Sequence, residues 1–146
     1  MGRRKREKVK TMMRELVTKL LLGLVVCAPA GGAEAIFDSG TLTTDSPQRV
    51  VDIDVGLGGS DRVYLVADDA GDGYSRDWAA WIEPKFVGPS GEQRLTGLEW
   101  REATTGWGRV HVGKNSGGGA IMIDGKRYAD GIGVHAKSVL EYRSPW

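Results

Sequence analysis

The feature that most constrains the fold is a series of short runs in which apolar and polar residues alternate, with almost no helical periodicity after residue 35. The run RVVDIDVGL places Val51, Ile53 and Val55 on one face of a strand and two aspartates on the other. Many of the 22 glycines stand at the ends of such runs, where tight turns use them. We therefore predict an all-β protein, folded as an antiparallel β-sandwich.

Further strand candidates follow along the chain. DRVYLVAD is apolar enough for a central strand, and AAWIEPKFVG contains Pro84, which predicts an edge position or a bend. IDGKRY predicts a hairpin whose turn is Asp124-Gly125. The remaining candidates are LTGLEW, GRVHVGK, AIMIDG, KRYADGIGVHA and SVLEYR.

The first 35 residues have the layout of a secretory signal peptide, which we predict as a helix. Basic residues come first, the apolar run Leu20–Ala28 follows, and two Ala-x-Ala matches end at Ala30 and Ala35. The apolar run is too short to cross a bilayer, which needs about 20 residues. We therefore expect no stable membrane span, and export to a secreted, periplasmic or cell-surface location.

Cys27 leaves lipoprotein anchoring as an alternative form of export. A lipoprotein signal has a small residue directly before its cysteine, whereas Val26 precedes Cys27. Cleavage after Ala35 would leave a domain without cysteine, and so without a disulfide, a cysteine nucleophile or a thiolate metal site.

The charge of the domain after Ala35 argues against nucleic acid as a partner. Lys and Arg number 20, of which 8 precede Ile36, and Asp and Glu number 19, of which 3 precede it. The domain thus holds 12 cations and 16 acids, a net charge of −4. Phosphate binding needs a concentrated basic surface instead.

The sequence suggests one domain, residues 36–146, with a single plausible seam. VGPSGEQ (87–93) divides it into a first segment, 36–90, and a second, 91–146. The chain stops at LEYRSPW, directly after a strand candidate, so we expect an unpaired sheet edge and a domain that is incomplete at its C-terminus.

An acidic stretch, DDAGDGYSRDWAAW, allows two interpretations. Asp69, Asp72 and Asp77 could hold a structural Ca²⁺, although the spacing does not match an EF-hand. Alternatively, the aspartates of this stretch accept hydrogen bonds from backbone N–H groups in a turn. Paired acids could also hydrolyse a glycoside, but so small a chain could hardly build a deep cleft around them.

Tryptophan and histidine supply the candidate binding residues. Trp78 and Trp81 differ by three, so on a strand they face opposite sides. Trp107 stands between two glycines, and tryptophan is the side chain expected to stack on the apolar face of a sugar ring. Burial in the core is the alternative for each of them.

His135, in DGIGVHAKS, lacks the partners of a catalytic triad or of a zinc site. We expect it to hydrogen-bond to backbone in a turn, or to contact a ligand directly. His111 lies in a strand candidate and is expected to be an ordinary surface or cross-strand residue.

Taken together, these motifs resemble the NPCBM family of carbohydrate-binding modules. The downstream resemblance covers residues 95–142 and rests on Gly106, Trp107, Gly108, Gly125, Tyr128, Gly131, Ile132, Gly133, His135, Ala136 and Ser138. An upstream segment also resembles the family, at Asp69, Gly71, Asp72, Gly73, Asp77 and Trp81. In the family arrangement this upstream part comes last, which implies a permuted module or the end of one copy joined to the start of another.

The resemblance implies a galactose-binding-like jelly roll that binds carbohydrate without cleaving it, without a cofactor, beside glycosidase or cell-surface domains of secreted bacterial proteins. Loops at one end of such a sandwich supply the sugar contacts, which selects Trp78, Trp107 and His135. The alternatives are a structural or protein-interaction sandwich that binds no sugar, and a glycosidase fragment. Exposure of the three residues around one site favours sugar binding, and burial of all three favours the interaction sandwich.

Overall fold

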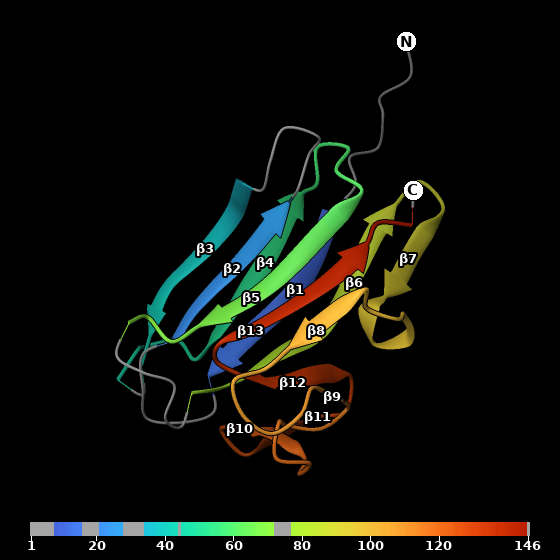
Figure 1. The fold of residues 1–146 in the computed structure, drawn as a ribbon. Helices are drawn as coiled ribbons and strands as arrows, with labels where there is room; N and C mark the ends of the chain where they lie inside the picture. Colours follow the sequence, from blue (N-terminus) through green and yellow to red (C-terminus); the bar gives the residue numbers. More distant parts are fainter. Residues whose placement is uncertain (1–7, 16–20, 28–33, 44, 72–76, 146) are drawn as a thin grey trace.

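The computed structural model describes residues 8–15, 21–27, 34–43, 45–71 and 77–145. These residues form two antiparallel β-sheets and a small hairpin, and the one helical segment among them is a single 3₁₀ turn, η1 (Leu95–Gly97). No helix in these ranges is long and apolar enough to cross a membrane. Figure 1 shows the two sheets stacked face to face, so the predicted all-β sandwich is confirmed.

The first sheet has the strand order β4-β1-β6-β12-β9, and β7 pairs with β6 beside β12. Strand β6 is long because it changes partners: residues 78–82 pair with β12 and residues 85–88 pair with β7. The bounds are β4 (Val50–Gly56), β1 (Lys8–Glu15), β6 (Trp78–Gly88), β12 (Gly131–His135), β9 (His111–Val112) and β7 (Gly91–Arg94).

The second sheet has the order β3-β2-β5-β13-β8. Its bounds are β3 (Glu34–Leu42), β2 (Leu21–Cys27), β5 (Arg62–Asp68), β13 (Ser138–Arg143) and β8 (Glu102–Thr104). The hairpin joins β10 (Ile121–Ile123) to β11 (Lys126–Tyr128), as predicted. Its turn residues Asp124 and Gly125 both have positive φ, 47° and 78°, as a type I′ turn requires.

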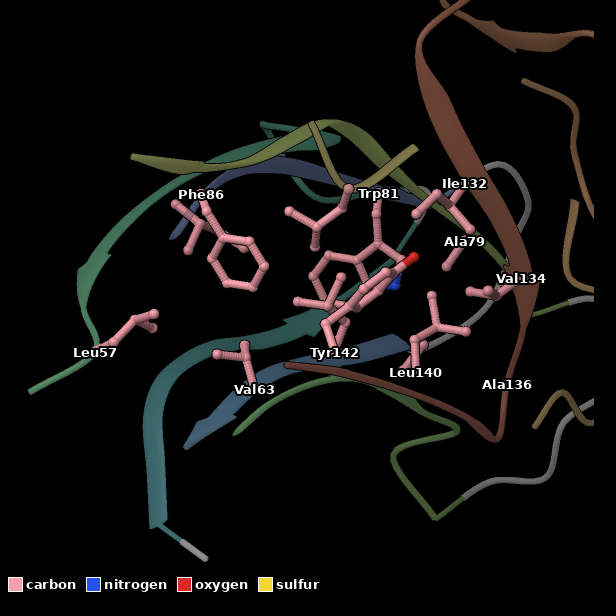
Figure 2. Close-up of a cluster of buried hydrophobic side chains, with 14 of the residues drawn as sticks. Leu57, Val63, Ala79, Trp81, Phe86, Ile132, Val134, Ala136, Leu140 and Tyr142 are labelled. Atoms are coloured by element: carbon pink, nitrogen blue, oxygen red, sulfur yellow. The ribbon is translucent and has the colours of Figure 1, made fainter. Parts of the chain in front are cut away.

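The core lies between the two sheets and follows the alternation of the sequence. In β4, Ile53 is buried while Asp52 and Asp54 are exposed. Trp81 and Tyr142, which project from opposite sheets, are the largest fully buried side chains and lie at the centre of the cluster in Figure 2. These two aromatic rings therefore fill the space between the sheets and form the centre of the hydrophobic core.

Pro84 marks a bend in a central strand, so the expected edge position is wrong and the bend is confirmed. Glu83, directly before it, has a positive φ of 48° and donates its N–H to the carbonyl of Asp130. Opposite them the register of β1 shifts between Lys10 and Met12, which is a β-bulge. Pro84 has no backbone N–H, and the bulge places it where β6 changes from pairing with β12 to pairing with β7, so no ladder hydrogen bond is lost there.

The N-terminal segment differs from the predicted helix, because residues 8–15 and 21–27 are strands. β1 lies between β4 and β6, and β2 lies between β3 and β5. A short, continuous apolar run has the same composition in a signal peptide and in a fully paired strand, so periodicity cannot separate the two. Cleavage of residues 1–35 stays a prediction.

The predicted unpaired edge at the C-terminal strand is wrong. β13 pairs with β5 on one side and with β8 on the other, so it is an interior strand. The neighbour β8 lies well upstream in the chain, and sequence order alone did not show that it would cover this edge.

Candidate functional site

The structure brings Trp78, Trp107 and His135 together at one end of the sandwich. Trp78 opens β6 and His135 closes β12, and the two are opposite one another in the sheet register. Trp107, from the loop between β8 and β9, stacks on Trp78 with ring centroids 5.7 Å apart and planes 28° apart. Its centroid is also 5.9 Å from that of His135, with the planes tilted by 59°.

The three side chains differ in exposure, which assigns them different roles. Trp107 is 53% exposed and is the most exposed large hydrophobic residue among the described residues. Trp78 is half-buried, and His135 is 3% exposed. A ligand in solution would therefore meet Trp107 first, while Trp78 and His135 support its ring from the protein side.

Thr105 and Gly106 fix the loop that carries Trp107. The Thr105 hydroxyl accepts the N–H of His135 at 3.0 Å and donates to the carbonyl oxygen of His135 at 3.1 Å. The same carbonyl oxygen accepts the N–H of Gly106 at 3.1 Å. A Cβ on Gly106 would lie 2.1 Å from the carbonyl oxygen of Ala136. Only glycine therefore allows this close approach, and Trp107 is held directly over β12.

A glycine-rich loop packs against the other aromatic ring. The Asn115 side-chain oxygen accepts the N–H groups of Gly117 and Gly119, both at 3.0 Å, and its amide donates to the carbonyl of Ala120 at 3.1 Å. A Cβ on Gly117 would lie 2.7 Å from the Cη2 atom of Trp78. Asn115 thus shapes the loop, and Gly117 lets it lie flat on the indole.

The family model of the NPCBM/NEW2 domain matches residues 22–87 and 91–145. The chain belongs to the NPCBM/NEW2 domain family. This is a family of carbohydrate-binding modules. Neither the curated proteins nor the solved structures gave a match. The three residues between the matched segments are Gly88, which ends β6, and the two turn residues that lead to β7, and they lie within the seam seen in the sequence. All three candidate site residues lie inside the match.

In this NPCBM/NEW2 domain, His135 is bound to backbone as the sequence predicted. Its Nδ1 lies 2.7 Å from the carbonyl oxygen of Ala136. A carbonyl oxygen only accepts, so Nδ1 carries the hydrogen and donates it. The ring is therefore fixed in orientation beneath Trp107.

The first aspartates of the acidic stretch also act on backbone, as the turn interpretation predicted. Asp68 Oδ1 accepts the N–H of Ala70 at 3.2 Å, and Asp69 Oδ1 accepts the N–H of Gly71 at 3.0 Å. The Gly71 hydrogen bond lowers the pKa of Asp69, and the charge of Lys137 lowers it further.

The calcium prediction is not tested by these contacts. Asp72 lies outside the described residues, and among the residues described no group of three or more His, Cys, Asp or Glu side chains could hold a metal. Asp77 is fully buried, and its carbonyl accepts the N–H of Ala136, so it ties the start of β6 to the end of β12.

The other tryptophans of the NPCBM/NEW2 domain lie elsewhere. Trp81 is fully buried, so Trp78 and Trp81 face opposite sides of β6 as predicted. Trp100 is half-buried and lines an open depression of about 350 Å³ with Leu98, Glu99 and Val112. Trp146 lies outside the described residues.

Three site-building residues were not found from the sequence: Thr105, Asn115 and Gly117. The signal for two of them is visible in retrospect, because an asparagine closely followed by serine and three glycines is typical of a loop whose backbone N–H groups bind a side chain. Thr105 carries no such signal, since its partner His135 is 30 residues away.

Proposed function

We propose that this chain is a non-catalytic carbohydrate-binding module that holds a sugar ring on the outer face of Trp107. One observation carries the proposal: an indole that is half exposed is stacked on a second indole at 5.7 Å and flanked by a fixed imidazole. A side chain placed to fill the core would not be exposed in this way.

The chemistry of the site suits a sugar. The C–H groups on one face of a pyranose ring are apolar and pack on an aromatic face, while the hydroxyls point outward to polar groups and water. Trp78 holds the Trp107 ring in place, so little side-chain freedom is lost on binding. A single stacked ring gives a weak contact, and we expect dissociation constants nearer to the millimolar level, about 4 kcal/mol, than to the nanomolar.

Binding without cleavage is supported by the state of the nearby acids. Glycoside hydrolysis uses two carboxyl groups facing the bond to be broken. Asp69 is buried and engaged with a backbone N–H, and Asp77 is fully buried, so neither presents its carboxylate to a sugar on Trp107.

We further propose that the chain acts outside the cytoplasm, in a secreted or cell-surface protein beside a hydrolase or other domain. The basic and apolar N-terminal layout supports export. Fractionation of the native source with intact-mass measurement tests this: recovery outside the cytoplasm with β1 and β2 retained supports export of the folded domain, and recovery only from the cytoplasm contradicts it.

Glycan-array binding and affinity electrophoresis in polysaccharide gels test the sugar proposal on the full chain. We expect Trp107→Ala to abolish retardation without unfolding the protein, because its side chain is half exposed. Met122→Ala is the matched control, since Met122 is another exposed apolar side chain, 44% exposed, on the hairpin.

Two results would contradict the proposal in different ways. If the folded wild-type protein binds no glycan, the function is wrong and a protein-interaction sandwich becomes the better interpretation. If Trp107→Ala binds as well as wild type, the site is wrong although the function stands.

A further inference from the structure

The segment that carries Trp107 differs in charge from the rest of the domain. Residues 103–123 contain Arg109, His111 and Lys114 but no aspartate or glutamate. The remainder of the chain contains 18 Lys and Arg residues and 19 Asp and Glu residues. An acid-free basic stretch in a chain that otherwise holds nearly equal numbers of basic and acidic residues indicates that this surface attracts negative charge.

The structure places Arg109 and Lys114 on the two loops that build the site. Arg109 is two residues beyond Trp107, a span of at most about 7 Å, and its N–H donates to the carbonyl of Ser116 at 3.2 Å. Ser116 directly precedes Gly117, the residue that lies on Trp78. Arg109 therefore stands where the Trp107 loop meets the glycine-rich loop.

His111 and Lys114 lie along the same edge. His111 Nε2 is 3.9 Å from the Cβ position of Gly118, so the imidazole faces the glycine-rich loop. The carbonyl oxygen of Lys114 lies 2.2 Å from the Cβ position of Gly133, which places Lys114 over β12, two residues before His135.

Arg109 and Lys114 are exposed, and neither forms an ion pair with any of the described residues. Other cations of the domain do have acidic partners. Three such pairs are Lys85–Glu92 at 2.8 Å, Arg94–Asp130 at 2.8 Å and Arg101–Glu141 at 3.6 Å. The cations beside Trp107 thus remain available to a ligand.

Three of the described acids close to the site in the chain, Asp69, Asp77 and Glu99, do not offset this charge. Asp69 and Asp77 are buried, and Asp69 already has Lys137 at 3.7 Å. Glu99 is exposed, but it lines the depression with Val112. Val112 follows His111 in β9, and neighbouring residues of a strand face opposite sides, so Glu99 lies across the strand from the glycine-rich loop.

We propose that the ligand is an anionic glycan, whose sugar ring stacks on Trp107 while a carboxylate or sulfate group is bound by Arg109 and Lys114. This inference rests on the proposed function and narrows its ligand class. The arginine fork can bind two oxygens of either group, and lysine adds a point charge. A uronic acid and a sulfated sugar share this chemistry.

Affinity electrophoresis of the full chain distinguishes the two sources. The gels contain polygalacturonate for the carboxylate, chondroitin sulfate and its desulfated form for the sulfate, and neutral galactan as the uncharged reference. We expect retardation by at least one anionic polymer that exceeds the retardation by galactan and falls with added NaCl. Loss of binding on desulfation assigns the sulfate; equal binding of desulfated polymer or polygalacturonate assigns the carboxylate.

Single substitutions locate the contact. We expect Arg109→Ala and Lys114→Ala each to weaken binding of the anionic polymer by about two- to five-fold, the range of an exposed ion pair, and to leave galactan binding unchanged. Arg143→Ala is the matched control: Arg143 is exposed and lies about 16 Å along β13 from Ser138, away from the site.

The results separate this inference from the proposed function. If galactan binds as tightly as the anionic polymers and Arg109→Ala changes nothing, the inference is overturned while sugar binding stands. If Trp107→Ala binds the anionic polymers like wild type, the surface is a plain electrostatic patch and the inference is overturned. If no glycan is bound at all, the proposed function fails and the inference fails with it.

Discussion

Removal of residues 1–35 should unfold this domain, because it deletes two strands that hold others in place. β4 ends the first sheet and β1 is its one neighbour there, while β3 ends the second sheet and depends in the same way on β2. The truncated chain, starting at Ile36, would therefore lose β1 and β2 and leave β4 and β3 without partners.

The magnitude follows from the strand register. β1 pairs seven residues with β4 and seven with β6, and β2 pairs six with β3 and six with β5. An antiparallel ladder makes on average one hydrogen bond for each residue pair. Even at about 0.5 kcal/mol net per bond, the loss is about 13 kcal/mol. Domains are stable by only about 5–15 kcal/mol, so little or no folding free energy would remain.

Urea denaturation followed by tryptophan fluorescence and near-ultraviolet circular dichroism tests this. We expect a cooperative transition for the full chain and for a control lacking residues 1–7, which removes no described strand. We expect no transition for residues 36–146. If the truncated chain unfolds cooperatively at the same urea concentration as the full chain, the reasoning is refuted. The domain could then stay folded after cleavage of a signal peptide.

Two further predictions concern stability. Gly106→Ala should destabilise the domain by about 1–3 kcal/mol and weaken glycan binding, because the added Cβ would overlap the Ala136 carbonyl. Gly97→Ala is the control, since the Cβ position of Gly97 has no atom within 4 Å. Equal urea midpoints of the two variants would contradict the prediction. The pKa of Asp69 is lower in the folded protein than in the unfolded chain, where it is about 3.9. The ionised carboxylate therefore stabilises the fold at pH values above about 3.9, and this stabilisation is lost as the pH falls through the folded pKa. Asp69→Asn should therefore lower the urea midpoint at neutral pH and flatten its fall in acid; an unchanged acid limb would show that the Gly71 hydrogen bond adds nothing.

Much of the fold was predictable from local patterns. The alternation around Ile53 placed this residue in the core, and Asp124-Gly125 predicted the hairpin turn with its two positive φ angles. Both features are set by residues that are close in sequence, where period and turn chemistry act directly. The same local logic separated buried Trp81 from Trp78 in the site.

Features that depend on distant partners were not predictable. The run Leu20–Ala28 predicted a helix, but β2 is a strand because β3 and β5 flank it on both sides. β13 was expected to expose an edge, but β8 covers it. In each case the neighbour comes from another part of the chain, and no local pattern reports it.

The candidate site shows the same division. The sequence by itself determined the residue types, which are tryptophans that can bind a sugar ring when exposed, a histidine among glycines, and a basic stretch without acidic residues. The tertiary structure decided that Trp78, Trp107 and His135 converge, through the pairing of β6 with β12 and the hydrogen bonds between Thr105 and His135. The physical reason is that a strand register and a loop-to-strand contact are made between segments about 30 to 60 residues apart, whose meeting is favoured by packing of the whole core and not by any one of them alone.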